Sequence, residues 1–67
     1  MTREWLVRER ERCGLSQAEV AKQSGIVQQS YQLIEKGTNN PRPGTAIRIA
    51  EVLGIDWKRF FIEESEG

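Results

Sequence analysis

Glycine recurs along this chain at short intervals, and this spacing constrains the possible fold more than any other feature. The internal glycines are Gly14, Gly25, Gly37, Gly44 and Gly54. Apolar residues in the stretches between them recur at intervals of three and four, which is the period of one helix face. None of these stretches alternates with the strict period of two that a half-buried strand shows. The spacing therefore predicts an all-α fold built from short helices.

Apolar stripes and helix-end signals together predict five helices, over about 3–13, 17–24, 27–36, 43–53 and 56–62. The clearest stripe runs through the fourth, where Ala46 is followed by apolar residues at positions i+3, i+4 and i+7. Ser16 and Glu19 have the spacing of a capping box, which marks the start of the second helix. Asp56 is suited to cap the last helix, and 37–42 is expected to be the one longer loop.

The composition excludes several classes of protein. A chain of 67 residues is long enough for one domain, and its single cysteine, Cys13, cannot form an internal disulfide. The absence of histidine removes the usual general base and leaves no sensible zinc site. We therefore expect no metal, no cofactor and no enzymatic activity. No apolar run approaches the ~20 residues of a membrane span and no signal peptide opens the chain, so a cytoplasmic protein is expected.

Charge is divided unevenly along the chain, although the formal total is zero. Residues 1–48 carry eight Lys or Arg against five Glu, a net +3, whereas residues 49–67 carry two against five acidic residues, a net −3. Binding to phosphates depends on the cations inside the contact area and not on the total charge. A neutral sum therefore does not exclude a nucleic acid partner. We expect one domain over 1–62, followed by an acidic tail over 63–67.

The stretch from residue 15 to residue 37 has the pattern of two short helices joined by a tight turn. Gly25 permits a sharp reversal after the first helix, and Ala21 permits the two helices to approach closely. The apolar side chains that are placed to pack between the two helices are Val20, Ile26 and Ile34. Such a pair is typical of a helix-turn-helix motif, whose second helix enters a DNA major groove while the first crosses the backbone.

Residues at fixed spacing along nearly the whole chain resemble those of a known family. They are Arg10, Gly14, Leu15, Ser16, Gln17, Val20, Ala21, Gly25, Ile26, Gln28, Tyr31, Ile34, Glu35, Gly37, Pro41, Ile49, Ala50, Leu53, Gly54 and Ile55. Their order is similar to the phage repressor/Cro-type helix-turn-helix family, which includes small xenobiotic-response-element-like regulators of bacteria. The resemblance implies a five-helix lambda-repressor-like DNA-binding domain with the helix-turn-helix at its second and third helices. It also implies a regulator of transcription, and a repressor is the expected form.

The resemblance places the base-reading residues at the start of the third helix. Gln28 and Gln29 are suited to pair bidentately with adenine, and Gln32 follows one turn later on the same face. The alternative is that these glutamines form an ordinary polar face. Val27 and Leu33 depart from the family, which usually has a hydroxyl residue at the first position and a polar or basic one at the second. Exposed Val27 is expected to contact a thymine methyl, and Leu33 either to do the same or to shield the groove edge.

Phosphate contacts are expected to flank these residues. Gln17 stands at the start of the second helix, where backbone amides and the helix dipole favour an anion; the alternative is a solvated side chain. Lys36 either neutralises a phosphate or favours the dipole of its own helix. Asn39, Asn40 and Arg42 belong to the loop, which either lies against the DNA backbone or is an ordinary turn.

Arg10 is a charged residue on an otherwise apolar helix face. The resemblance implies that it pairs with Glu35 across the edge of the core, and we interpret this pair as structural. Cys13, the aromatic side chains, Ile49 and Leu53 are expected in the core.

The expected partner is double-stranded operator DNA, bound by a homodimer. Four apolar residues near the end of the chain, Ile55, Trp57, Phe60 and Phe61, exceed what one short helix need bury. We therefore expect the dimer contact near the fourth and fifth helices; the alternative is that all four residues close the core.

A second hypothesis is an antitoxin or an antagonist-controlled regulator, whose main partner is a protein. The lack of a toxin-wrapping segment after about residue 62 favours the first hypothesis.

Overall fold

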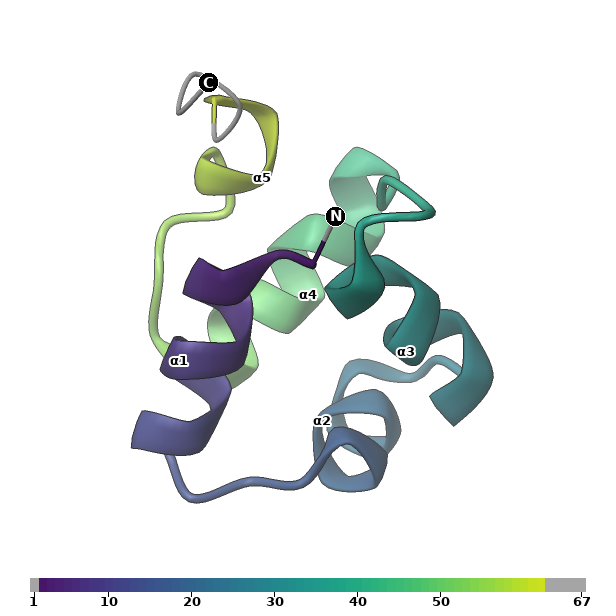
Figure 1. The fold of residues 1–67 in the computed structure, drawn as a ribbon, viewed down its shortest axis with the longest axis vertical. Helices are drawn as coiled ribbons and strands as arrows, with labels where there is room; N and C mark the ends of the chain where they lie inside the picture. Colours follow the sequence, from purple (N-terminus) through teal and green to yellow (C-terminus); the bar gives the residue numbers. More distant parts are fainter. Residues whose placement is uncertain (1, 63–67) are drawn as a thin grey trace.

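The computed structural model describes residues 2–62, which form five α-helices and contain no strand (Figure 1). The helices are α1 (Glu4–Arg12), α2 (Gln17–Ser24), α3 (Gln28–Lys36), α4 (Pro43–Leu53) and α5 (Arg59–Ile62). The all-α fold predicted from the sequence is confirmed, and the bounds of α2, α3 and α4 lie within one residue of the expected ones. Within the described residues, no helix is both long enough and apolar enough to span a membrane. The expected acidic tail over 63–67 lies outside the described residues.

Local hydrogen bonds set the start and the end of α2. Ser16 Oγ accepts a hydrogen bond from the Glu19 amide at 3.0 Å, and the Glu19 carboxylate accepts one from the Ser16 amide at 2.7 Å. These two bonds form the predicted capping box. The helix ends at Gly25, whose φ of 76° is left-handed and reverses the chain toward α3. An L side chain is strained at this angle, which explains why a glycine stands there.

The prediction for the last helix was wrong at its start. We expected a helix over 56–62 capped by Asp56, but α5 begins only at Arg59. The Asp56 carboxylate accepts a hydrogen bond from the Lys58 amide at 3.0 Å, and the Asp56 carbonyl accepts one from the Arg59 amide at 3.1 Å. These bonds close a turn before the helix, so Asp56 shapes that turn and does not cap α5.

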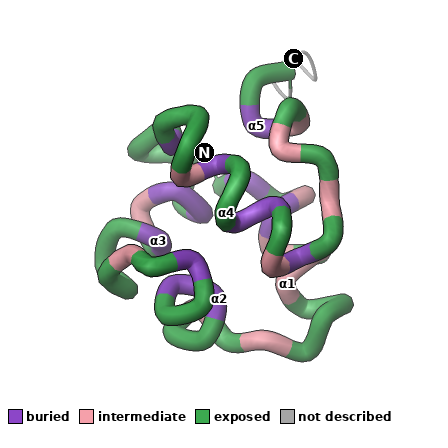
Figure 2. Tube along the Cα trace, turned by 180° about the vertical axis from the view of Figure 1, so that it is seen from behind, coloured by how far each residue is buried: buried purple, intermediate pink, exposed green. Residues whose placement is uncertain are grey.

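The core lies between the inner sides of the four longer helices, and α5 adds one residue to it (Figure 2). Its buried apolar members are Leu6, Val20, Ala21, Tyr31, Ile34, Ala46, Ile49, Ala50, Leu53 and Phe60. Helix α2 packs against both α3 and α4, and α1 packs against α3. Helices α2 and α5 lie near opposite ends of the molecule (Figure 1).

Four residues expected in the core are less buried than predicted, namely Trp5, Cys13, Trp57 and Phe61. Cys13 is exposed because it follows the last residue of α1, and its Sγ lies 3.5 Å from the Leu53 carbonyl oxygen at the surface. Phe61 is 47% exposed and contacts Trp57 edge to face, with ring centroids 5.8 Å apart. Trp57 itself is half-buried, whereas Phe60 is buried against Trp5. The short α5 can turn only one of its two adjacent aromatic rings toward the core.

Ser24 gives a first testable prediction about the core. Its side chain is buried, and its Oγ is the only buried side-chain polar atom of residues 2–62 without a hydrogen-bond partner. An unsatisfied buried hydroxyl costs free energy, and alanine also has the higher helix propensity. We expect Ser24→Ala to raise the free energy of unfolding by about 1 kcal/mol, measured by urea denaturation. A lower free energy of unfolding would show that this hydroxyl has a stabilising partner.

Candidate nucleic-acid interface

Helices α2 and α3 form the predicted pair joined by a tight turn. Val20 and Ala21 are almost fully buried in the joint, and Ile34 faces them from α3 with only 4% of its surface exposed. The turn ends at Val27, which takes the N-cap position of α3 without a side-chain hydrogen bond. Val27 is 66% exposed, so the turn presents an apolar side chain to solvent at the start of α3.

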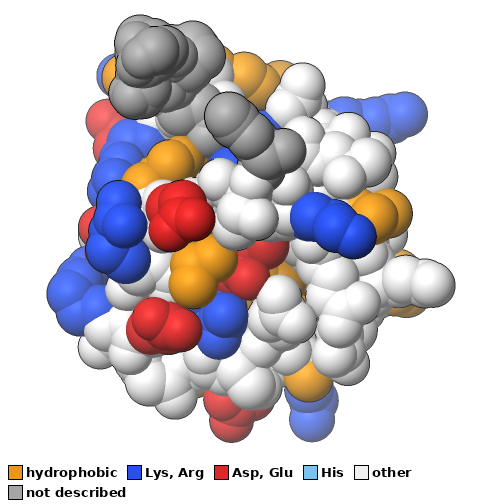
Figure 3. Space-filling model, viewed as in Figure 1, with side chains coloured by type: hydrophobic (Ala, Val, Ile, Leu, Met, Phe, Trp, Pro, Cys, Tyr) orange, Lys and Arg blue, Asp and Glu red, His pale blue; other side chains and the backbone are white. Residues whose placement is uncertain are grey.

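The first residues of α3 form an uncharged polar surface. Gln28, Gln29 and Gln32 are all exposed, and together with Val27 they occupy the N-terminal half of the helix. In the space-filling view, charged side chains gather over α1, whereas the side that carries α3 is mainly uncharged (Figure 3). Amide groups there have both donors and acceptors free to meet base edges.

Leu33 lies differently from the prediction. It was expected to face outward, but it is only half-exposed. The chain after α3 turns back, and the amides of Thr38 and Asn39 donate to the Leu33 carbonyl at 3.1 and 3.2 Å. The start of the loop thus folds against the last turn of α3 and limits the exposure of this residue.

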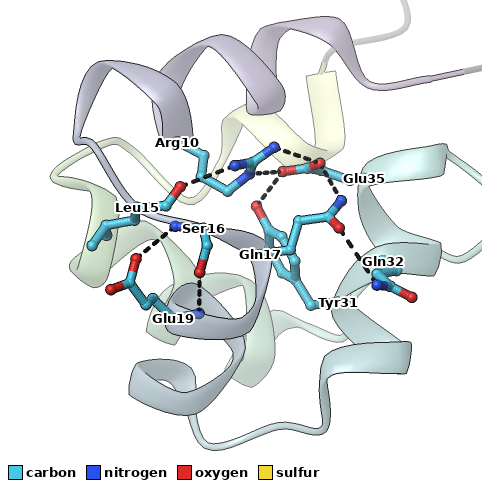
Figure 4. A network of polar contacts seen from close by, with 8 residues as sticks. All are labelled: Arg10, Leu15, Ser16, Gln17, Glu19, Tyr31, Gln32 and Glu35. Atoms are coloured by element: carbon cyan, nitrogen blue, oxygen red, sulfur yellow. Dashed lines mark hydrogen bonds and ion pairs between the residues drawn. The ribbon is translucent and has the colours of Figure 1, made fainter.

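A polar network joins α1, α2 and α3 behind this surface (Figure 4). Arg10 and Glu35 form the expected ion pair, with Arg10 Nε 2.5 Å from Glu35 Oε2 and Nη2 3.3 Å from Oε1. The Tyr31 hydroxyl donates to Glu35 Oε2 at 2.8 Å, and Gln17 Nε2 donates to Oε1 at 2.8 Å. Arg10 also donates to the Leu15 carbonyl at 2.9 Å. One carboxylate therefore holds three helices in register.

The network determines the charge state of its members. Burial raises the pKa of Glu35, but hydrogen bonds from Arg10, Gln17 and Tyr31 outweigh it, and the pKa lies below its ordinary value. Burial, with the hydrogen bond to Glu35, raises the pKa of Tyr31. The tyrosine is therefore a neutral donor and the glutamate an anion at neutral pH.

This lowered pKa predicts a loss of stability in acid. A group whose pKa is lower in the folded state stabilises the fold fully above its unfolded pKa, which is about 4.5 for glutamate. That contribution is lost as the pH falls through the folded-state value. We expect the free energy of unfolding to fall steadily below about pH 4.5, and Glu35→Gln to flatten this dependence. Because hydrogen bonds from Arg12 and Arg59 also lower the pKa of Glu9, Glu9→Gln measures how much of the acid slope this second carboxylate contributes. If Glu35→Gln leaves the acid slope unchanged, Glu35 is not its source.

Gln17 has a more internal position than expected. Its side chain is half-buried and bonded to Glu35, and its Oε1 lies 3.5 Å from Gln32 Nε2 (Figure 4). A shallow hollow of about 280 Å³ opens beside it and is also lined by Thr2, Gln32, Glu35 and Lys36. Gln17 thus connects the buried ion pair to the exposed face of α3, and one of its amide hydrogens remains for an anion.

The residues of the loop have solvent-exposed positions at the end of α3. Lys36, Asn39, Asn40 and Arg42 are all exposed. Gly37 ends α3 in a left-handed conformation, with φ of 86°, so the loop over 37–42 begins directly at the end of α3. Backbone amides, asparagine amides and cations at such a place are suited to DNA phosphates.

Arg3 is the residue that sequence reasoning missed. Its side chain is buried, and its guanidinium donates to the carbonyls of Ile34 and Asn39 and to Asn40 Oδ1. These acceptors lie more than thirty positions along the chain. No local pattern connects so distant a pair of segments, and the charge of Arg3 alone favoured an exposed position.

Comparison with known proteins identifies the class to which this arrangement belongs. A family model described as helix-turn-helix matches residues 6–60, which is most of the chain. The chain therefore belongs to this helix-turn-helix family, and the resemblance to the phage repressor/Cro-type regulators is confirmed.

One curated relative supports the same conclusion. An uncharacterized HTH-type transcriptional regulator of Bacillus subtilis (strain 168), YqaF, is 43% identical over 61 residues. The aligned region covers 91% of this chain and 80% of that protein. No solved structure gives a significant match to the chain.

Proposed function

We propose that this protein is a DNA-binding regulator of transcription that reads an operator with α3. The observation that carries the proposal is the exposed row of Val27, Gln28, Gln29 and Gln32 at the start of α3, on a helix fixed to α2 by a buried joint. Glutamine pairs bidentately with adenine in the major groove, and an exposed valine fits the methyl group of thymine. The relative from Bacillus subtilis is named as an HTH-type transcriptional regulator, which agrees with this role.

Phosphate contacts on either side of α3 would fix its position in the groove. Gln17 at the start of α2 has an amide hydrogen to donate beside the helix N-terminus. Beyond α3, Lys36, Asn39, Asn40 and Arg42 are exposed toward a second stretch of backbone. Few of these groups are cations, so affinity should depend on amide and dipole contacts and should fall gently with salt.

The proposal includes a dimer and a repressing role. Two copies on a palindromic operator would place their α3 helices about one helical turn, or ~34 Å, apart. Exposed Phe61 and Ile62 on α5, with Ile47 of α4, give that end of the chain the apolar surface expected of a dimer contact. A dimer bound over a promoter would block access and so repress.

Selection from a pool of random DNA duplexes tests this function. We expect an enriched sequence with two inverted half-sites, and two chains per duplex in the complex as measured by mass. Enrichment of a single half-site would contradict the dimer. No enrichment of any sequence would overturn the proposed function and favour a protein partner.

A further inference from the structure

We propose that Arg3 is a positioning residue for DNA binding, because it fixes the loop after α3 in the shape that presents its phosphate-contacting groups. This inference rests on the proposed DNA-binding function and adds a residue outside the helix-turn-helix to it. Arg3 precedes α1 and does not belong to the expected DNA surface, since only 7% of it is exposed.

The first part of the evidence is how one guanidinium connects the end of α3 to the loop. Arg3 Nη1 donates to the Ile34 carbonyl at 2.5 Å and to the Asn39 carbonyl at 3.0 Å. Arg3 Nη2 donates to Asn40 Oδ1 at 2.6 Å. The Ile34 carbonyl also accepts a hydrogen bond from the Gly37 amide at 3.1 Å, and a cation at this end of α3 complements the helix dipole. Arg3 thus supplies a C-terminal cap to the recognition helix from a distant part of the chain.

The second part is that Arg3 is itself held from two sides. Its backbone amide donates to the Glu35 carbonyl at 2.7 Å, and its guanidinium carbon lies 5.7 Å from the centre of the Phe60 ring. A guanidinium over an aromatic face is attracted to it. The side chain therefore has a fixed direction, and so do the acceptors that it contacts.

The third part is the effect on Asn40. Its Oδ1 is taken by Arg3, which orients the side-chain amide and leaves its NH₂ group to donate elsewhere. An amide that can rotate freely loses entropy when it binds a phosphate, whereas one already oriented does not. Arg3 therefore contributes to affinity without touching DNA.

Affinity measurements on three variants and the wild type test the role. We expect Arg3→Gln to bind the selected duplex about tenfold more weakly, as is typical of residues that act through another. Arg3→Lys should recover little of this loss, because lysine keeps the charge but lacks the planar fork. Arg8→Gln on the exposed side of α1 removes the same charge and should bind like the wild type. All four chains are checked for folding by far-UV circular dichroism at the temperature of the binding assay.

Combining Arg3→Gln with Asn40→Ala separates positioning from a direct contact. If Arg3 acts through Asn40, the double variant should bind only about as weakly as the weaker single variant. Faster amide hydrogen exchange in Arg3→Gln at Thr38 and Asn39, whose amides donate to the Leu33 carbonyl, would agree. Additive losses, or Arg3→Gln affinity equal to that of Arg8→Gln, would overturn the role of Arg3 while leaving DNA binding intact. A wild-type chain that binds no duplex would overturn both proposals.

Discussion

Replacing Glu35 with alanine is expected to lower the free energy of unfolding by about 3–5 kcal/mol, enough to unfold a large fraction of so small a domain. Glu35 is 3% exposed and accepts hydrogen bonds from Arg10, Gln17 and Tyr31. Its removal leaves the Arg10 guanidinium desolvated without its anion, and the tyrosine hydroxyl without its acceptor. Thermal and urea denaturation at pH 7 would measure the loss.

A matched pair of controls shows whether burial is the cause. Glu4 and Arg8 form an exposed i, i+4 pair on α1, with 71% and 73% side-chain exposure for Arg8 and Glu4. Glu4→Ala should therefore cost less than about 0.5 kcal/mol. Replacing both Arg10 and Glu35 with apolar residues of similar size should cost less than removing Glu35 alone, because no charge is left unpaired. A Glu35→Ala loss as small as that of Glu4→Ala would show that the pair does not hold the three helices together.

Replacing Gln28 or Gln29 with alanine is expected to weaken binding to the selected operator by about 1–3 kcal/mol and to relax the base preference at one position each. Both side chains are exposed in the first turn of α3 and bond to no other side chain that would be left unpaired. The loss should therefore come from DNA contacts and not from the fold. Fluorescence anisotropy with the selected duplex and with duplexes altered at single positions measures both effects.

Gln23 offers the matched control for these substitutions. It is an exposed glutamine near the C-terminal end of α2, at the other end of that helix from Gln17. We expect Gln23→Ala to leave affinity and base preference unchanged. If Gln28→Ala and Gln29→Ala also leave the base preference unchanged, then α3 does not read these bases.

Much of the fold could be predicted because local chemistry determines helix ends. The capping box of Ser16 and Glu19, and glycines at left-handed positions such as Gly25, placed α2, α3 and α4 correctly. The last helix was predicted too long because Asp56 has the same chemistry in a turn as at a helix cap. Asp56 therefore indicates that the chain turns near this position, but tertiary contacts decide at which residue the last helix begins.

The exposed half of the candidate site could be predicted, and so could the Arg10–Glu35 ion pair, which the family resemblance implied. The spacing of Gln28, Gln29 and Gln32 on one helix follows from the helical period. The contacts of Gln17 with Glu35 and of Arg3 with Asn40 join segments that are far apart in sequence. Their geometry depends on how the helices pack, which periodicity does not determine.

In the proposed function, α3 and the loop after it form the surface that meets DNA. Backbone amide shifts measured by NMR as the selected duplex is added would locate this surface. We predict that the largest shifts fall on residues 27–42 and on Gln17 at the start of α2. Large shifts confined to the outer face of α1 and to α5, with residues 27–42 unchanged, would contradict it.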